Sequence, residues 1–302
     1  MESISRELYD CVIIGGGAAG LSAANILARA RRKVVVVDAG DQSNKASRVA
    51  HSVFGHDNES PNALYELASK QLQKYSVAQL HARVTAVVRG SDSYFHATLD
   101  DDTVLHARTV LLAQGVEYQL PSLPGLRKLW GTKAWHCPYC DGYEHRDQKL
   151  LVITEPDGVD HMSLILPSWS KYLTYAVDAT TLTSDTLDRI RSNKGVIAPP
   201  VTRLRDTPTG VQAFFSEGIV AHFDSVIVGP TITPRDSLAQ SLRCKRDEQN
   251  CIKRDEHGRT TRPNVYVAGD QTDIMQQVNI AVASGHKAAV AIHEDLARQN
   301  IH

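Results

Sequence analysis

Residues 10–20 read DCVIIGGGAAG, an apolar run followed at once by a cluster of glycines. The apolar run has the length of a short buried strand, and residues 21–32 after the glycines carry apolar side chains at helical spacing. A second apolar run, residues 33–37, ends at Asp38. A strand, a glycine turn, a helix and a strand in this order predict a βαβ unit at the start of the chain.

The glycine cluster fits the dinucleotide-binding pattern G-x-G-x-x-G. In this pattern Gly15 permits a tight turn, Gly17 lets the backbone approach a pyrophosphate, and Gly20 allows the helix to pack closely on the strand. The helix then presents its free N–H groups to the phosphates, and Asp38 can accept hydrogen bonds from ribose hydroxyls. The pattern alone does not distinguish FAD from NAD. The predicted nucleotide-binding residues here are Gly15, Gly17, Ala18, Ala19, Gly20 and Asp38.

The composition limits the classes of partner. The chain has 302 residues, 42% of them hydrophobic, and a net charge of −1. A net charge this small gives no electrostatic reason to expect nucleic acid or an acidic membrane surface as a partner. No window approaches the ~20 apolar residues that span a bilayer, and the first residues do not resemble a signal peptide. We therefore expect a cytoplasmic protein without a membrane segment.

A second pair of motifs favours FAD. Residues 265–270 read VYVAGD, which on its own could be any buried strand that ends at a turn. It resembles the second flavin motif of flavoproteins with two dinucleotide-binding domains. Residues 111–115, LLAQG, resemble the A-T-G segment of the same proteins. The resemblance implies that Asp270 holds the ribityl chain of FAD and that the next helix points its N-terminus at the flavin. The flavin contacts that it implies are Gln114, Gly115, Gly269, Asp270, Gln276, Gln277 and Val278.

Residues 136–143 read HCPYCDGY and contain a pair of cysteines with a redox spacing. Two thiols separated by two residues can close a disulfide at the start of a helix, and either can attack a partner disulfide while the other resolves the mixed disulfide. A zinc site needs two more ligands, and Cys244 and Cys251 lie outside the usual knuckle spacing. A purely structural disulfide is disfavoured in the cytosol. The spacing therefore favours a redox couple.

Taken in order, these motifs are similar to those of low-molecular-weight thioredoxin reductases over most of the chain. The resemblance implies that Cys140 is the thiol that reacts with the flavin and that Cys137 exchanges with the partner. It also implies that Asp141 handles the thiol proton, a role that suits a carboxyl whose pKa is raised by burial; an Asp that only caps a turn is the alternative. His136 could lower a thiol pKa if it were protonated, or it could be a surface histidine.

The second nucleotide motif of that family is missing. In the family, the strand after the redox motif runs into its own glycine-rich turn and binds NADPH. Here residues 154–160 read TEPDGVD, with Thr and Pro at the expected glycines and three acidic side chains. Pro156 also removes a backbone donor. Residues 178–185, DATTLTSD, contain no basic residue for a 2′-phosphate. We expect NADPH not to be the electron donor, or to bind poorly; a diverged but working site is the alternative.

The expected fold is α/β, with two Rossmann-like domains and the second inserted into the first. Residues 1–116 and 232–302 would form the FAD-binding domain. Residues 117–231 would form the redox domain, with the CPYC motif and a degenerate NADPH-type fold. Helices are expected near residues 61–75 and 277–299, and a small antiparallel sheet at residues 83–112. The resemblance implies a homodimer.

The direction of electron flow stays open at this stage. The motif around the cysteines resembles ferredoxin-dependent and deeply rooted thioredoxin reductases. It equally resembles the dithiol oxidases of the gliotoxin and holomycin type, in which oxygen accepts the electrons. The partner would accordingly be thioredoxin or a small-molecule dithiol or disulfide, with ferredoxin as a possible donor. A flavin-binding redox sensor without turnover and a zinc protein with an adenylate-binding domain are the alternatives from other classes.

Overall fold

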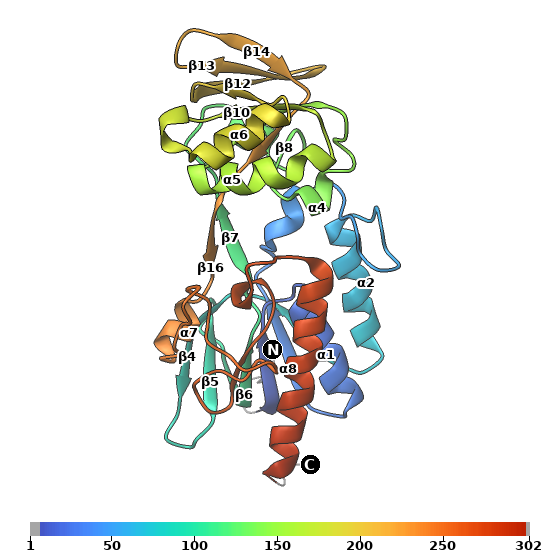
Figure 1. Cartoon of the computed structure of the whole chain (residues 1–302). Helices are drawn as coiled ribbons and strands as arrows, with labels where there is room; N and C mark the ends of the chain where they lie inside the picture. Colours follow the sequence, from blue (N-terminus) through green and yellow to red (C-terminus); the bar gives the residue numbers. More distant parts are fainter. Residues whose placement is uncertain (1–6, 300–302) are drawn as a thin grey trace. The chain divides into compact units, whose positions relative to one another are not determined.

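The computed structural model describes residues 7–299 of the chain (Figure 1). The chain divides into two compact units. Unit 1 contains the residues up to Lys45, Val53–Glu117 and the residues from Thr233 onward, and unit 2 contains Ala46–Ser52 and Tyr118–Ile232. The segment Ala46–Ser52 therefore belongs to unit 2, although the chain on both sides of it belongs to unit 1. Each unit is built on a parallel sheet, which confirms the predicted α/β fold.

Unit 1 is built on a sheet with the strand order β3-β2-β1-β6-β5-β4, in which β17 also pairs with β6. Five strands run parallel: β1 (Leu8–Ile14), β2 (Val34–Asp38), β3 (Ala78–His81), β6 (Val104–Leu112) and β17 (Val265–Val267). The chain then continues the sheet with two antiparallel strands, β4 (Val84–Arg89) and β5 (Phe95–Leu99). These two strands and β6 form the small antiparallel sheet that the sequence predicts.

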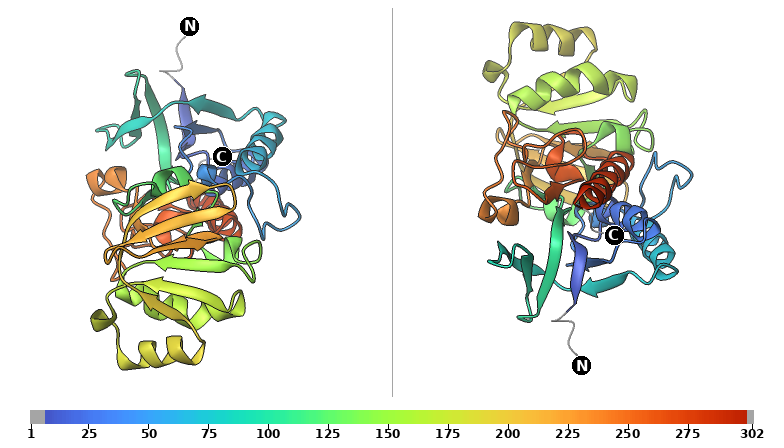
Figure 2. Two further views of the ribbon diagram at one scale, coloured as in Figure 1. Left: turned by 90° about the horizontal axis from the view of Figure 1, so that it is seen from above. Right: turned by 90° about the horizontal axis from the view of Figure 1, so that it is seen from below.

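The parallel strands β1, β2 and β17 of unit 1 are buried on both faces. Alternate residues of a strand point to opposite faces, so Cys11 and Ile13 pack against the helices while Val12 and Ile14 pack toward β4, β5 and the short helix α7 (Ser237–Ser241). The helices are α1 (Ala18–Arg29), α2 (Pro61–Gln73) and α8 (Val278–Arg298). Figure 2 shows α1 and α8 side by side. A side chain on Gly285 of α8 would collide with the backbone oxygen of Ala19, so this close packing requires glycine.

The start of α2 shows how local sequence sets a helix boundary. Ser60 is the N-cap, and its hydroxyl accepts a hydrogen bond from the N–H of Ala63 at 3.1 Å. Pro61 occupies the first helical position, where its missing N–H costs nothing. Both features confirm the predicted helix near residues 61–75.

Unit 2 has a five-stranded parallel sheet with the order β11-β10-β9-β15-β8. Its strands are β8 (Ala134–Trp135), β9 (Lys149–Ile153), β10 (Tyr172–Ala176), β11 (Val196–Ala198) and β15 (Ser225–Val228). One face packs on α5 (Pro156–Ile165) and α6 (Ser184–Ser192) through Val159 and Ile190. The other face packs on a three-stranded antiparallel sheet of β12 (Val201–Thr207), β13 (Gly210–Phe215) and β14 (Val220–Phe223).

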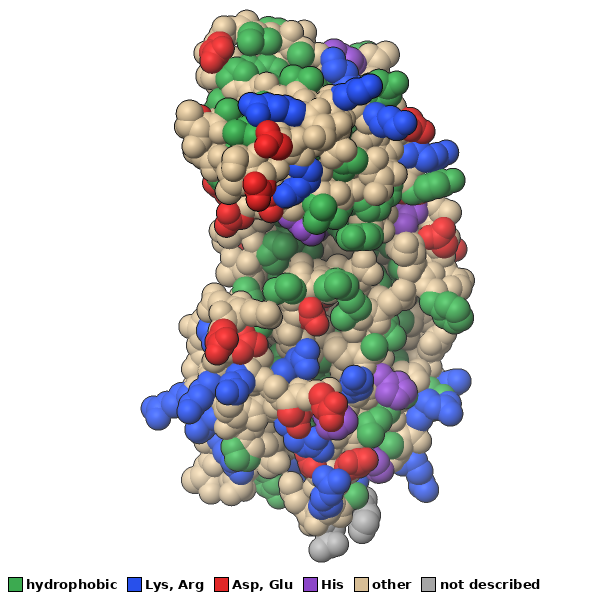
Figure 3. Space-filling view, in the orientation of Figure 1, with side chains coloured by type: hydrophobic (Ala, Val, Ile, Leu, Met, Phe, Trp, Pro, Cys, Tyr) green, Lys and Arg blue, Asp and Glu red, His purple; other side chains and the backbone are tan. Residues whose placement is uncertain are grey.

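Two strands lie where the chain passes between the units. β7 (Val116–Gln119) and β16 (Thr231–Pro234) pair with each other as a separate two-stranded sheet. On the face shown in Figure 3, Lys and Arg side chains are interspersed with Asp and Glu. Among the described residues, no helix combines the length and the apolar character needed to cross a lipid bilayer.

Candidate redox and nucleotide sites

The glycine turn between β1 and α1 is shaped by steric contacts inside unit 1. Gly15 has a φ of +112°, and a side chain there would collide with the carbonyl of Ala113. A side chain on Gly20 would collide with the carbonyl of Gly15. These two glycines are therefore required by the turn and by the close approach of helix and strand, as the fingerprint predicts.

Gly17 is different, because among the described residues only Gln42 comes near the position that a side chain there would take. A side chain there would meet only Gln42 Cγ, at an ordinary contact distance of 3.8 Å. Gly17 is also the N-cap of α1, and no side chain in the described part of the protein caps the helix. The first N–H groups of α1 are thus left for another acceptor. The open space and the uncapped helix end fit a pyrophosphate.

Asp38 closes this site from the end of β2. Its Oδ1 accepts hydrogen bonds from the N–H groups of Gly16 at 3.1 Å and Gly40 at 3.2 Å. Gln42 Nε2 donates to both carboxylate oxygens, at 3.0 and 2.9 Å. The sequence did not single out Gln42, because its role comes from the folding of the loop back onto Asp38 rather than from a motif.

Among the described residues, several buried side-chain oxygens of unit 1 lack a hydrogen-bond donor, and two of them belong to the predicted nucleotide-binding region. The side-chain oxygens of Gln42 and Gln114 are buried and have no hydrogen-bond partner within the described chain. A buried unsatisfied acceptor costs about 1–3 kcal/mol, so ligand donors at these positions would stabilise the protein. Gln42 lies beside the nucleotide turn, and Gln114 lies in the segment that resembles the A-T-G motif. Both therefore fit a dinucleotide with hydroxyl and N–H donors.

The turn after β17, which resembles the second flavin motif, is hydrogen-bonded to α8. The N–H of Gly269 donates to Ser284 Oγ at 2.8 Å, and α8 begins at Val278 after Gln277. Burial raises the pKa of Asp270 to about 6, and the charge of Asp273 adds to this shift. A pocket of about 160 Å³ opens beside Asp270. Because burial disfavours the ionised carboxyl, a hydroxyl donor beside it would stabilise the charged form, which fits the ribityl contact that the resemblance implies.

The cysteine pair lies at the start of α4 (Pro138–Asp141) in unit 2. Cys137 is the N-cap residue, and it forms a disulfide with Cys140 whose Cα atoms are 5.2 Å apart. The Cys137 carbonyl accepts hydrogen bonds from the N–H groups of Cys140 at 3.0 Å and Asp141 at 3.1 Å. The turn of helix that these bonds form brings the two sulfurs together.

Asp141 follows the disulfide directly, and burial raises its pKa above the ordinary value for a carboxyl. The positive charges of His145 and His51 lower it, and the negative charge of Glu144 raises it. His51 Nε2 lies 3.7 Å from a carboxylate oxygen of Glu144. His51 belongs to the segment Ala46–Ser52 of unit 2. No sequence pattern links this segment to the cysteines, so the sequence could not place it there.

His136 differs from both sequence-based expectations. Its ring stacks on Trp130 with centroids 5.6 Å apart and lies 4.7 Å from the ring of Tyr118. Burial in this aromatic surrounding lowers the pKa of His136 to about 4. The side chain is therefore neutral near pH 7 and half-buried. It is not the cation next to Cys137 that could lower a thiol pKa, and its ring, which is partly at the surface, is packed against aromatic side chains.

The β9–α5 junction of unit 2 corresponds to the glycine turn of unit 1, but it carries Thr154, Glu155 and Pro156 instead of the glycine cluster. Thr154 occupies the turn, and side chains added to Gly158 or Gly229 would collide with its Oγ1. Glu155 is the N-cap of α5, Pro156 is its first residue and Asp157 lies in its first turn. The helix start thus carries two carboxylates and lacks one N–H donor.

The two residues between β10 and η4 (Ala179–Thr181), Val177 and Asp178, also provide no positive charge. Asp178 Oδ1 accepts hydrogen bonds from the N–H and the hydroxyl of Thr180, at 2.9 and 2.8 Å. Nearby, Arg189 is engaged by Asp160, whose Oδ1 lies 3.1 Å from its Nη1. This part of unit 2 therefore offers no free basic group to a phosphate.

Comparison with protein families decides the class. Residues 9–154 and 183–285 match the family model described as pyridine nucleotide-disulphide oxidoreductase. The chain belongs to this family. Members of the pyridine nucleotide-disulphide oxidoreductase family bind FAD, and the protein is a flavin-dependent disulfide oxidoreductase.

Its relatives within the pyridine nucleotide-disulphide oxidoreductases are thioredoxin reductase-like. A protein of Arthroderma benhamiae named "Probable thioredoxin reductase" is 29% identical over 96% of this chain and 81% of its own length. A thioredoxin reductase of Mycolicibacterium smegmatis is 27% identical over 99% of this chain and 100% of its own. The crystal structure of HlmI is 33% identical with a TM-score of 0.93, over 97% of this chain and 94% of its own. The resemblance to thioredoxin reductases is thus confirmed over nearly the whole chain.

Proposed function

We propose that this FAD-dependent oxidoreductase exchanges electrons between its flavin and a Cys137–Cys140 redox pair, and that NADPH is not its reductant. One contrast carries the proposal. In unit 1 the turn after β1 leaves open space at Gly17, and the first turn of α1 contains no acidic residue. In unit 2 the corresponding turn holds Thr154, two carboxylates and a proline. A pyrophosphate at the second turn would meet like charge and lose donors, at a cost of several kcal/mol.

The residues proposed to hold FAD are those whose surroundings fit it. Gly15, Gly17, Ala18, Ala19 and Gly20 would surround the pyrophosphate, and Asp38 would accept from the ribose. Gln114, Gly115, Gly269, Asp270, Gln277 and Val278 would surround the flavin half. Bound FAD supplies the two-electron store with which the cysteine pair reacts.

The thiol chemistry follows from the two sulfurs of α4. In the reducing direction the Cys137 thiolate attacks a partner disulfide, forming a mixed disulfide and releasing one partner thiolate. The Cys140 thiolate then attacks the Cys137 sulfur, which restores the Cys137–Cys140 disulfide and releases the second partner thiolate. Two electrons pass from the protein dithiol to the partner. The reverse sequence oxidises a partner dithiol.

Asp141 is proposed to take and return the thiol proton in these steps. A carboxyl with an ordinary pKa is almost fully ionised at pH 7 and is a poor acid there. Burial raises the pKa of Asp141, which brings it closer to the pH at which it must both accept and donate. Asp141→Asn should slow reduction of the flavin by dithiols while leaving the disulfide and FAD in place.

The test is an anaerobic titration of the purified holoenzyme, followed in the flavin spectrum. Dithiothreitol or reduced thioredoxin should bleach the flavin, and NADPH at the same concentration should leave it oxidised. Rapid bleaching by NADPH would contradict the proposal that unit 2 does not bind NADPH as the reductant. Cys140→Ser is the matched control, because it should retain FAD yet resist bleaching by dithiol.

A second candidate function is oxidation of dithiols by oxygen. It is favoured by the same blocked second turn, since an enzyme that passes electrons from dithiol to oxygen needs no nicotinamide. Readmitting air to the dithiol-reduced enzyme with excess dithiol separates the two. Sustained oxygen consumption that matches disulfide formation supports the oxidase, whereas slow consumption with fast reduction of thioredoxin supports the reductase. A flavin-bound protein that turns over neither would be a redox sensor.

A further inference from the structure

A group of metal-ligating side chains lies on the antiparallel part of unit 1, away from the glycine turn. His96 on β5 and His106 on β6 are direct cross-strand partners. Their neighbours Phe95, Ala97, Leu105 and Ala107 belong to the hydrophobic core. Since alternate strand residues point to opposite faces, both histidines project from the face that is turned away from that core.

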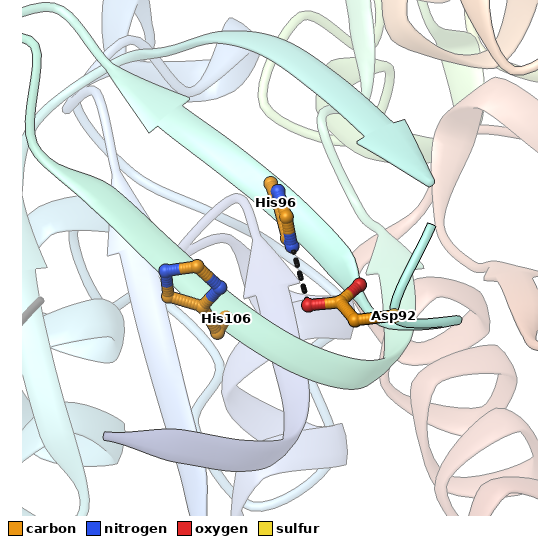
Figure 4. Close-up of side chains that lie close together, drawn as sticks. All are labelled: Asp92, His96 and His106. Carbon is orange, nitrogen blue, oxygen red and sulfur yellow. Dashed lines mark hydrogen bonds and ion pairs between the residues drawn. The ribbon is translucent and has the colours of Figure 1, made fainter. Parts of the chain in front are cut away.

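Asp92 joins this pair from the turn between β4 and β5. Its Oδ2 lies 3.1 Å from His96 Nε2, and the two imidazole rings are 4.5 Å apart between centroids. One ligand atom from each of the three residues lies within 4.8 Å of the others. Figure 4 shows the two rings on adjacent strands with the carboxylate beside them.

The turn holds this arrangement in place. Asp92 Oδ1 accepts a hydrogen bond from the N–H of Tyr94 at 3.1 Å, which leaves Oδ2 directed at His96. Because Gly90 has no side chain, Asp92 and His96 can occupy the space beside it. A side chain on Gly90 would lie 2.5 Å from Asp92 Oδ1 and 2.8 Å from His96 Nε2. Hydrogen bonds that orient a ligating carboxylate are typical of metal sites.

We propose that Asp92, His96 and His106 bind a divalent transition-metal ion, with zinc as the reference metal. Two imidazole nitrogens and one carboxylate suit zinc, copper and nickel better than magnesium or calcium, which prefer oxygen ligands. In a tetrahedral zinc site the ligand atoms are about 3.3 Å apart. His96 Nε2 and Asp92 Oδ2 are already 3.1 Å apart, and the three ligand atoms, all within 4.8 Å of one another, would have to draw closer around the ion. A water molecule completes the fourth position, as in other zinc sites with three protein ligands.

The nearby positive charge does not oppose the ion strongly. Arg108 lies on the same strand two residues after His106. Its guanidinium lies over the ring of Tyr94 at 5.6 Å, and its Nε is 3.6 Å from the Asp10 carboxylate. The arginine is thus partly neutralised by its own partner. A bound ion would link the β4–β5 turn to β6 and stabilise the antiparallel strands, because it binds only the folded arrangement.

The test uses the holoenzyme with its Cys137–Cys140 disulfide intact, so that the two redox thiols cannot compete for metal. Equilibrium dialysis against zinc should give about one bound ion per chain, and zinc should raise the unfolding temperature. His96→Gln and His106→Gln should each weaken zinc binding at least tenfold, and Asp92→Asn should weaken it less. His257→Gln is the matched control, because His257 is an exposed histidine 3.4 Å from the carboxylate of Glu256 in the same unit.

Two further measurements keep the outcome decisive if a histidine variant folds poorly. Gly90→Ala keeps every ligand but fills the space beside them, so it should weaken zinc binding while FAD content stays unchanged. Copper bound to the oxidised enzyme should show coupling to imidazole nitrogens in its electron paramagnetic resonance spectrum, and this coupling should be reduced in His106→Gln. Zinc binding that is equal in the wild type, the Gly90→Ala variant and the histidine variants would overturn the proposal. So would the absence of zinc binding by the wild type.

Discussion

The two units present the same strand–turn–helix element in opposite states. In unit 1, β1 leads through glycines to α1, and the space at the helix start is open. In unit 2, β9 leads through Thr154 to α5, and the helix start carries Glu155, Pro156 and Asp157 in place of glycines. The strand and helix positions survive in both units because apolar packing maintains them. The ability to bind a nucleotide depends on a few residues at the turn, which can be lost without loss of the fold.

Transferring the charge of unit 2 to unit 1 tests this contrast most strongly. Gly17→Asp should lower the affinity for FAD at least about 100-fold, because the carboxylate would meet the pyrophosphate. The helix should still form, since Gly17 has an extended backbone and Asp is a favourable N-cap. FAD absorbance after gel filtration measures the loss. Gly17→Ala separates the effect of volume from that of charge, and a fully yellow Gly17→Asp protein would contradict the assignment.

The acidic residues at the ends of β2 and β10 form a matched pair. Asp38→Ala should weaken FAD binding by about 10- to 100-fold, because it removes the acceptor for Gly16, Gly40 and Gln42 as well as for the ribose. Asp178→Ala removes only the cap of a short turn and should cost about 1 kcal/mol of stability. FAD dissociation constants and unfolding by urea distinguish them. Equal FAD affinities in the two variants would contradict the proposal that Asp38, and not Asp178, contacts the nucleotide.

Asp270 should give the apoprotein of unit 1 a specific pH dependence. Its pKa is raised to about 6 in the folded state, above the ordinary value of 3.8. The folded state therefore binds more protons than the unfolded state between these values. The resulting contribution to stability is present below pH 4 and is lost as the pH rises through 6. The loss should be about 1–3 kcal/mol, measured as the difference between wild type and Asp270→Asn in urea unfolding at several pH values. An identical pH profile for both proteins would refute it.

The smallest change in nucleotide affinity is expected from substitutions that make the β9–α5 turn of unit 2 more similar to the glycine turn of unit 1. The triple variant Glu155→Gln, Pro156→Gly, Asp157→Asn removes two charges and restores one N–H donor. Affinity for NADPH should rise by about tenfold but stay weak, because Thr154 still fills the turn and no basic group replaces the missing cluster. Quenching of NADPH fluorescence measures it. Tight NADPH binding by the unmodified enzyme would show that the two turns do not differ in function.

Much of unit 1 could be predicted because its signals are local. The glycine spacing, Asp38 and the Ser60-Pro61 cap each act within a few residues, and they predict β1, α1, β2 and α2. The three strands β12–β14 of unit 2 were not predicted. β12 shows why: in the sequence VTRLRDT only Leu204 is buried, so its pattern resembles a polar loop. It becomes a strand because its neighbours pair with it.

The site was predictable where a motif carries the chemistry and not where tertiary contacts do. Cys137, Cys140 and Asp141 lie within five consecutive residues, and the start of α4 brings them together. Gln42, Ser284 and His51 reach their partners only after the chain has folded, so no spacing reveals them. The ring stacking of His136 belongs to the same class, which is why the sequence left its charge undecided.

The packing of α8 on α1 sets when the cofactor can enter during synthesis. Gly285 packs against the backbone of Ala19, so α1 gains its contact with α8 only after most of the chain has been made. Unit 2, by contrast, is complete once residue 232 has left the ribosome tunnel. A polypeptide that lacks α8 therefore contains all of unit 2 but lacks the helix that packs on α1 beside the glycine turn.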